Sequence, residues 1–206
     1  MSPETVFKRG GRRFARRSEE TNMKGVVFNA AQEAVIELFD EDTWDDLLDA
    51  AGVDGVYSSV GSYPDEEMVA IVVAASEATG LSVEDVLVAV GRKALHHLAS
   101  RVPTLIGGCT NAFEMLGMIH DVIHVEVLKL YPDSRPPEFS YEDLPDGGLR
   151  MGYRSPRCLD ALAEGLILGV GDRFDTELRV ERHPISGSGE VYLDVWEVAA
   201  EQTQAA

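Results

Sequence analysis

The stretch MGYRSPRCLD, residues 151–160, marks the place where the hydrophobic pattern of the chain changes from strand-like to helical. Within it, Tyr153, Ser155 and Arg157 stand two residues apart. Alternate side chains of an extended chain point to the same side, so we expect a phenol, a hydroxyl and a guanidinium along one side of a strand. Such a row offers several hydrogen-bond donors and a fixed positive charge, which indicates a binding place for an anionic group.

On both sides of this stretch, the pattern predicts a ββαββ unit. Residues 157–173 are strongly apolar with a helical period, whereas the segments before and after them alternate between apolar and polar residues. The turn-forming sequences DGG and GSG separate the strands of the two pairs. The four predicted strands are residues 138–143, 149–154, 176–184 and 190–198.

The chain before Pro132 predicts helices, because apolar residues recur at steps of three and four. Ser82 followed by Asp85 is typical of a helix start. The predicted helices are residues 24–39, 42–50, 64–79, 83–100 and 111–131. We therefore expect an α+β fold, in which a helical N-terminal part precedes a four-stranded antiparallel sheet with helices at one face.

The composition is that of a globular protein with a strong acidic excess. Of 206 residues, 45% are hydrophobic, and the formal net charge of -18 argues against general binding of nucleic acid or anionic membranes. No apolar run reaches the roughly 18 residues of a membrane span. Cys109 and Cys158 lack the spacing of a zinc site, and although one disulfide between them is open, we expect free thiols in a reducing cytoplasm.

The two ends of the chain are expected to differ from residues 23–198, which we expect to form the folded unit. Residues 1–22 carry six basic side chains against three acidic ones and show no hydrophobic period. We expect a disordered tail there, although a basic arm for a partner, or an extension upstream of a start at Met23, would give the same pattern. Residues 199–206 are expected to form a second tail.

Two of the five histidines, His120 and His124, stand four residues apart on the apolar side of the predicted helix 111–131. A buried imidazole needs a hydrogen bond or a metal. Core histidines with satisfied hydrogen bonds and a zinc site are both open interpretations, and the HExxH pattern that would favour zinc is absent. His96 and His97 are adjacent and cannot face the same way on a helix.

Several motifs together resemble the heme nitric oxide/oxygen binding family, abbreviated H-NOX, which includes the sensor module of soluble guanylate cyclase. They are MKG, DTWDDLLDAAG, GVYSSVGSYPDEEM and GRKAL, followed by HDVIHVEVLKLYP, SRPPEF and GYRSPR. The resemblance covers residues 23–198. It implies a helical N-terminal subdomain (residues 23–85), a heme-ligating subdomain (residues 86–198), and heme b, iron protoporphyrin IX, as the cofactor.

The resemblance also assigns roles to individual residues. It implies that His124 is the proximal ligand of the heme iron and that Tyr153, Ser155 and Arg157 hold the heme propionates. A guanidinium pairs bidentately with a carboxylate and hydroxyls complete the contact, so the row of donors suits this role. The resemblance also places two apolar residues against the ring. Pro137 matches a proline that presses on the ring and helps to bend it, and Val27 matches an aliphatic residue that packs against it.

On the other side of the ring, the resemblance implies an apolar distal pocket. Oxygen-binding relatives place a tyrosine where this chain has Leu162, and the tyrosine hydroxyl donates to bound dioxygen. The other positions of the pocket are also apolar: Ala31, Ala94, Leu98 and Leu166. We therefore expect a ferrous heme that binds nitric oxide and carbon monoxide but not dioxygen.

The resemblance implies a bacterial cytoplasmic sensor that is not itself an enzyme. The signal would pass to a separate histidine kinase, or to a diguanylate cyclase or phosphodiesterase, when the bond between His124 and iron weakens and its helix is released. Two alternatives are a metal-dependent enzyme that uses His120 and His124, and a protein that binds a lipid or another small anion in the same pocket.

Overall fold

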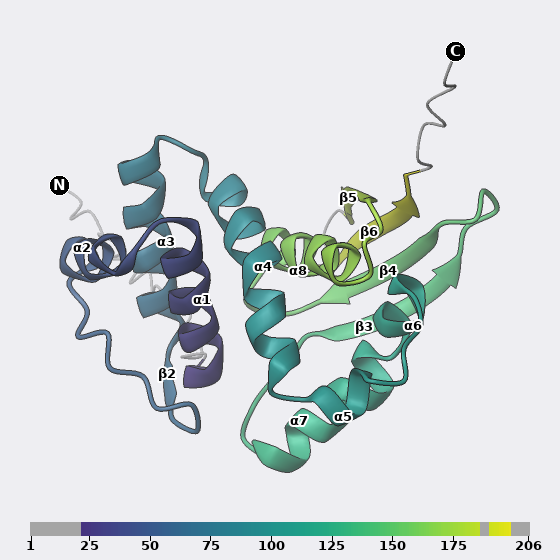
Figure 1. Ribbon diagram of the computed structural model, residues 1–206, viewed down its shortest axis with the longest axis horizontal. Coiled ribbons are helices and arrows are strands. Elements are labelled where there is room, and N and C mark those ends of the chain that lie inside the picture. Colours follow the sequence, from purple (N-terminus) through teal and green to yellow (C-terminus); the bar gives the residue numbers. More distant parts are fainter. Residues whose placement is uncertain (1–21, 186–189, 199–206) are drawn as a thin grey trace, which may run out of the picture.

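The computed structural model describes residues 22–185 and 190–198, which form a helical part beside a four-stranded sheet (Figure 1). The expected α+β fold is confirmed. Most of the predicted basic tail and all of residues 199–206 lie outside the described residues. Asn22, which was expected to belong to the tail, instead starts a short strand, β1 (Asn22–Lys24), that pairs with β2 (Ser62–Pro64).

The helical part has its own hydrophobic core. Phe28, Trp44 and Ile71 are buried in it, and they come from three different helices. The helix that carries Trp44 starts at a suitable residue, because Asp40 accepts a hydrogen bond from the amide of Thr43. The helices of this part are α1 (Gly25–Leu38), α2 (Glu41–Ala51), α3 (Asp65–Thr79) and α4 (Val83–Ser100).

The prediction of one continuous helix over residues 111–131 is wrong. The segment divides into α6 (Ala112–Gly117), a π-helical turn η1 (Ile119–His124) and α7 (Val125–Leu130), and the short α5 (Pro103–Ile106) precedes it. The Met118 carbonyl accepts hydrogen bonds from the amides of both Val122 and Ile123, at 3.1 and 3.0 Å. The second bond spans five residues, which widens the turn from α to π geometry.

The sheet is antiparallel throughout, with the strand order β3-β4-β6-β5. Its strands are β3 (Glu138–Asp143), β4 (Leu149–Arg154), β5 (Leu178–Pro184) and β6 (Glu190–Glu197). The helix α8 (Asp160–Arg173) connects β4 to β5 and packs over one face, where Met151, Leu193 and Val195 form a second buried core. No helix in the described ranges is long and apolar enough to cross a membrane.

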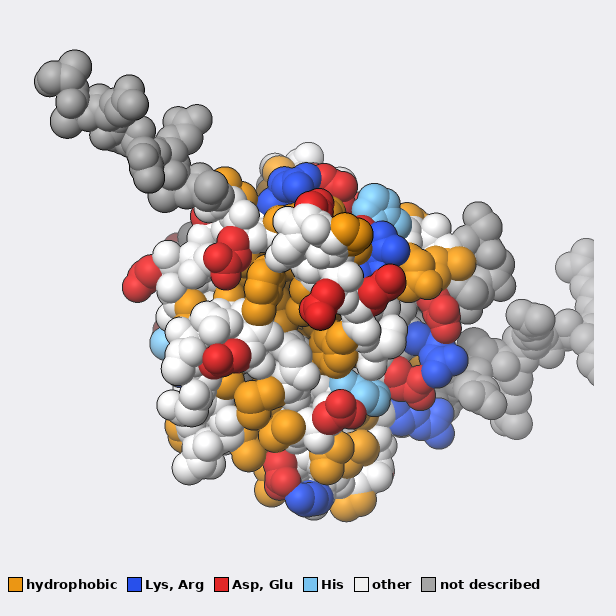
Figure 2. Space-filling view, turned by 90° about the vertical axis from the view of Figure 1, so that its right-hand side faces the viewer, with side chains coloured by type: hydrophobic (Ala, Val, Ile, Leu, Met, Phe, Trp, Pro, Cys, Tyr) orange, Lys and Arg blue, Asp and Glu red, His pale blue; other side chains and the backbone are white. Residues whose placement is uncertain are grey.

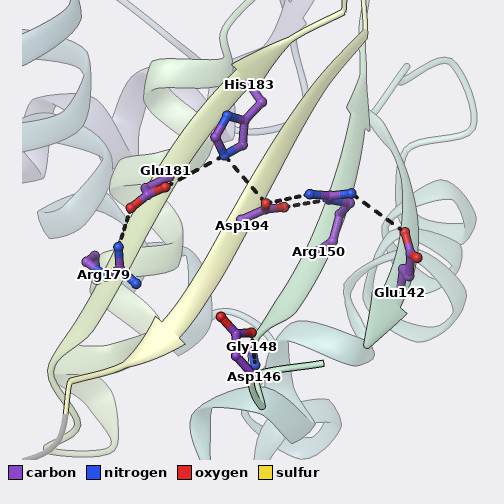
Figure 3. Close-up of polar contacts among 8 residues, drawn as sticks. All are labelled: Glu142, Asp146, Gly148, Arg150, Arg179, Glu181, His183 and Asp194. Atoms are coloured by element: carbon purple, nitrogen blue, oxygen red, sulfur yellow. Dashed lines mark hydrogen bonds and ion pairs between the residues drawn. The ribbon is translucent and has the colours of Figure 1, made fainter. Parts of the chain in front are cut away.

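The opposite face of the sheet is charged, as Figure 3 shows. Arg150 on β4 donates two hydrogen bonds of 2.7 Å to Asp194 on β6, and His183 on β5 lies 3.5 Å from the same carboxylate. The guanidinium of Arg150 also lies over the ring of Tyr192, 4.9 Å from its centroid. One face of the sheet therefore builds the core, and the other joins neighbouring strands through ion pairs.

Candidate heme site

His124 is the last residue of the π-helical turn η1, and its ring is partly buried. Burial lowers the pKa of the imidazole to about 4, although the nearby carbonyl of Pro137 acts in the opposite direction. The imidazole is therefore neutral at physiological pH, which is the form that binds a metal ion. Its Nδ1 atom is buried and makes no full hydrogen bond, although the carbonyl of Pro137 is close enough to the ring to influence it.

His120 occupies the same turn but is directed toward the sheet. Its Nδ1 accepts a hydrogen bond of 3.3 Å from the amide of Phe139, and its own amide donates to the hydroxyl of Tyr141 at 3.2 Å. These two bonds join η1 to β3. Because Nδ1 is engaged, and because the described residues contain no cluster of three or more His, Cys, Asp or Glu side chains suited to a metal, a zinc site at His120 and His124 has no support.

Phe139 connects the two parts of the candidate site, and it was not predicted from the sequence. Its ring centroid lies 5.9 Å from that of His124 and 5.7 Å from that of Tyr153. Phe139 is paired with Tyr153 in the register of β3 and β4, so both rings point to the same side of the sheet. The alternation of β3 could have identified this inward-facing aromatic residue.

The three donors first recognised in the sequence come together, but not along one strand. The strand β4 ends at Arg154, so the expectation of a strand through Arg157 is wrong. Tyr153 and Ser155 are both buried, and Arg157 lies in the turn that follows. The amide of Arg157 donates to the Ser155 hydroxyl at 3.3 Å. Burial raises the pKa of Tyr153, which keeps its phenol protonated and able to donate.

Arg157 is anchored by groups from distant parts of the chain. Its Nε donates to Asp65 at 2.8 Å, and its terminal nitrogens donate to the carbonyls of Arg135 at 2.7 Å and Asn22 at 2.6 Å. The side chains of Arg157 and Asp65 are only 10% and 12% exposed. A guanidinium has five N–H groups, so two remain for an anion. Asp65 was not predicted from the sequence, because nothing local links it to Arg157.

Pro137 lies just before β3, with its carbonyl close enough to His124 to affect the pKa of the imidazole. Val27, on α1, is partly buried and packs against the N-terminal core. The five expected distal residues are all apolar, and the three helices that carry them, α1, α4 and α8, pack together. Ala31 and Ala94 are buried, and the other three are partly buried: Leu98, Leu162 and Leu166.

This set of groups fits a heme chemically. A neutral imidazole suits the iron, the buried hydroxyls and the arginine suit the propionates, and the apolar helix faces suit the ring. The same set does not resemble a hydrolytic site, because no carboxylate or nucleophile pairs with His124 in the described ranges 22–185 and 190–198.

Comparison with known proteins agrees with this chemistry. Residues 24–182 match the family model described as Haem-NO-binding. An H-NOX protein from S. oneidensis, in its Fe(II)NO ligation state, is 30% identical, with a TM-score of 0.78 over 86% of this chain and 100% of that one. An unliganded Fe(II) H-NOX protein from K. algicida is 28% identical, with a TM-score of 0.75 over 88% of this chain and 100% of that one.

The fold is also shared with a mutant of the T. tengcongensis H-NOX protein. That structure is 24% identical, with a TM-score of 0.72 over 84% of this chain and 95% of that one. No curated protein matches the chain.

Proposed function

Because the chain belongs to the Haem-NO-binding family and has the fold of its heme-binding sensor domains, we propose that it senses nitric oxide. In this proposal it carries heme b, binds nitric oxide and carbon monoxide in the ferrous state, and excludes dioxygen. It has no catalytic activity of its own and signals in the bacterial cytoplasm to a separate effector, either a histidine kinase or a diguanylate cyclase or phosphodiesterase.

The observation that carries the proposal is the environment of His124. It is a neutral imidazole at the end of a π-helical turn, with the carbonyl of Pro137 near its ring and an aromatic neighbour that also touches Tyr153. Heme, when bound, would supply the ferrous iron that takes the gas. His124 would hold that iron, and the ring would pack against Val27 and Pro137.

The propionates would be held by Tyr153, Ser155 and Arg157. The phenol stays protonated, the guanidinium has two free N–H groups, and all three residues are held in place by other bonds. Rigid donors lose little conformational entropy on binding an anion, so they bind it more strongly than mobile surface donors do.

The choice of gas would follow from Leu162 and the other four apolar residues of the distal pocket. Bound dioxygen carries partial negative charge and gains from a hydrogen-bond donor, whereas nitric oxide and carbon monoxide need a donor much less. A hydrogen bond to a charged group is worth about 1.5 to 3 kcal/mol, roughly one to two decades in affinity. None of Ala31, Ala94, Leu98 or Leu166 has a polar side chain that could supply such a donor.

The output would use the weak attachment of the His124 segment. No residue of η1 or α7 is fully buried, and only the partly buried Ile119 and Ile123 pack against the second core, so a limited set of packing contacts opposes their displacement once His124 is released. The segment continues directly into a loop that bonds to other parts of the chain. The Arg135 carbonyl of this loop accepts a hydrogen bond from Arg157, and Asp133 pairs with Lys24. Displacement of the segment would therefore pull on contacts with the N-terminal part, and this shift would be the signal to the effector.

The proposal is tested by absorption spectra of the purified, reduced protein. We expect a heme spectrum that shifts with nitric oxide and with carbon monoxide under nitrogen, and no stable oxy spectrum when air is admitted. A colourless protein after expression with ample heme supply would contradict the whole proposal, and a stable oxy spectrum would contradict its gas selectivity.

A single added donor gives a sharper test of selectivity. Leu162→Tyr places a hydroxyl where this chain has only carbon, so we expect it to raise the affinity for dioxygen by one to two decades. Leu162→Phe is the matched control, because it adds the same ring without the hydroxyl. Equal dioxygen affinity in both variants would show that the missing donor does not set the selectivity.

A further inference from the structure

A second pocket lies where α1, α4 and α8 meet, and it shares no lining residue with the candidate heme site. Its volume is about 620 Å³, which is within the range of small-molecule sites. Side chains from all three helices line it, together with Gly169 of α8. The polar side chains of the lining are Glu37, Arg92, Lys93, His96, His97, Asp172 and Arg173.

The lining is cationic in a chain whose formal net charge is -18. Acidic side chains are spread over the face of the molecule seen in Figure 2, whereas this pocket has three fixed cations against two carboxylates. Both carboxylates are already neutralised. Glu37 pairs with Lys93 at 2.8 Å, and Asp172 pairs with Arg92 through two bonds of 2.6 Å.

The remaining cation, Arg173, has no such partner. Its guanidinium makes no hydrogen bond or ion pair with any described residue, and the electrostatic neighbour it has is the uncharged thiol of Cys109. His96 and His97 were expected to face different ways, but both line this pocket. The imidazole of His96 is free of polar contacts in the same ranges, and its ring meets that of His97 edge to face, with 5.5 Å between centroids. His97 itself lies 3.0 Å from Glu33. The pocket thus contains hydrogen-bond donors without a described acceptor, on Arg173 and His96, beside cations that are already paired with carboxylates.

From this arrangement we propose that the pocket binds a phosphate group of a small molecule. The planar fork of Arg173 gives two parallel hydrogen bonds to phosphate oxygens, and His96 gives a further one. Arg92 uses only Nε and Nη2 for Asp172, so its Nη1 is available to the same anion. A phosphate, with three terminal oxygens and up to two negative charges, satisfies these donors better than a single carboxylate does.

The site joins three helices that the ion pairs already connect. Lys93 and His97 link α4 to α1 through Glu37 and Glu33, and Arg92 links α4 to α8 through Asp172. A phosphate bound between Arg92 and Arg173 would add a contact across the junction of α4 and α8. It would therefore stabilise this junction in the folded protein.

The experiment is a calorimetric titration of the purified full-length protein with inorganic phosphate and, separately, with pyrophosphate, at constant ionic strength set with chloride. We expect saturable binding of at least one probe. Arg173→Gln should weaken it about tenfold, because it removes a guanidinium that makes no hydrogen bond or ion pair with a described residue. Tighter binding of pyrophosphate would indicate a polyphosphate ligand, and equal binding would indicate a single phosphate group.

The matched control is Arg179→Gln, which removes the same charge from the sheet, where Arg179 lies over Trp196. We expect it to leave the affinity for phosphate unchanged. No saturable binding of either probe at millimolar concentration would overturn the proposal. Equal weakening by the two substitutions would also overturn it, because the effect would then be one of net charge.

Discussion

The two segments that carry the candidate heme ligands are held in place in different ways. The segment from Ile119 to Leu130 contains His124, and none of its residues is buried. The segment around Tyr153 is central in the sheet, next to a fully buried Met151 and a buried Ser155. The hydrophobic core therefore fixes Tyr153, whereas the segment of the proposed iron ligand rests on the core only through the partly buried Ile119 and Ile123. Two polar bonds of His120 and one aromatic contact of His124 complete its attachment.

This difference suits a sensor that must keep its cofactor while it changes shape. A segment with few buried contacts opens at low free-energy cost, whereas a core strand opens only when the domain unfolds. A proposed bond from His124 to iron would then be the main restraint on η1 and α7. Its loss would free these elements and leave the strand β4 and the turn after it unchanged.

The largest expected effect is that of His124→Gly. If this imidazole is the restraint and the iron ligand, the variant should lose the heme spectrum of the wild type, and added imidazole should restore it. The measurement is the absorption spectrum of the purified variant with and without imidazole. His183→Gly is the control, because His183 lies on the charged face of the sheet and should not alter the spectrum.

An unaltered heme spectrum in His124→Gly would contradict the role of His124 as the iron ligand, because the iron would then be held elsewhere. Hydrogen exchange adds a second readout. The amides of α7 should exchange faster in the variant, and those of β4 should not change, since only the first segment depends on the imidazole.

The second largest effect is expected for Arg157→Gln, in the turn that follows β4. It leaves Asp65 buried without its partner, which costs about 3 to 5 kcal/mol in the free energy of unfolding. The measurement is urea unfolding of the purified protein. Arg154→Gln is the control, because its guanidinium is 61% exposed and its ion pairs with Glu138 and Glu190 should contribute little.

The double variant Asp65→Asn/Arg157→Gln separates a lost ion pair from a general loss of packing. It removes the unpaired charge together with its partner, so it should recover part of the stability lost in Arg157→Gln. A double variant that is less stable than Arg157→Gln would show that the ion pair is not what holds the turn.

The contrast between the segments also explains which features the sequence predicts. The ends of β3 and β4 agree with the prediction, because alternation and the DGG turn are local signals. The start of α4 agrees too, because Ser82 accepts from the amide of Asp85 as an N-cap does. The π turn could not be predicted in this way, since it depends on one carbonyl that accepts two amides.

Long-range partners set a second limit on prediction from the sequence. Asp65 and Arg157 are 92 residues apart in the chain, and neither residue has a local feature that indicates the other. Alternation in the sequence singled out Tyr153, Ser155 and Arg157 as donors for an anion, but their role toward heme propionates and the role of His124 came from a resemblance between motifs. Their assignment to a heme therefore stays a prediction, although the structure brings the three donors together and places Phe139 between His124 and Tyr153.

A smaller effect is expected for His120→Ala. The change leaves the amide of Phe139 without its acceptor and should cost about 2 kcal/mol in local stability. The measurement is the exchange rate of the Phe139 amide, which should rise. His120→Asn keeps a side-chain oxygen that can accept the same bond, so it should recover part of the protection. Unchanged exchange in His120→Ala would show that this bond does not hold η1 on the sheet.

The smallest effect concerns the charged face of the sheet. Its contribution to the free energy of unfolding is expected to depend on pH only in the acidic range. The ion pair with Arg150 lowers the pKa of Asp194 below its ordinary value. A carboxyl group whose pKa is lower in the folded state stabilises the fold above its unfolded value of about 3.9. That stabilisation is lost as the pH falls through the folded-state pKa.

Wild type should therefore unfold at a higher urea concentration than Asp194→Asn near neutral pH, and the difference should shrink below about pH 4. Because this ion pair joins β4 to β6 and not to the His124 segment, the exchange of the α7 amides should be the same in both proteins. Faster exchange there in Asp194→Asn would mean that the two segments are not held independently.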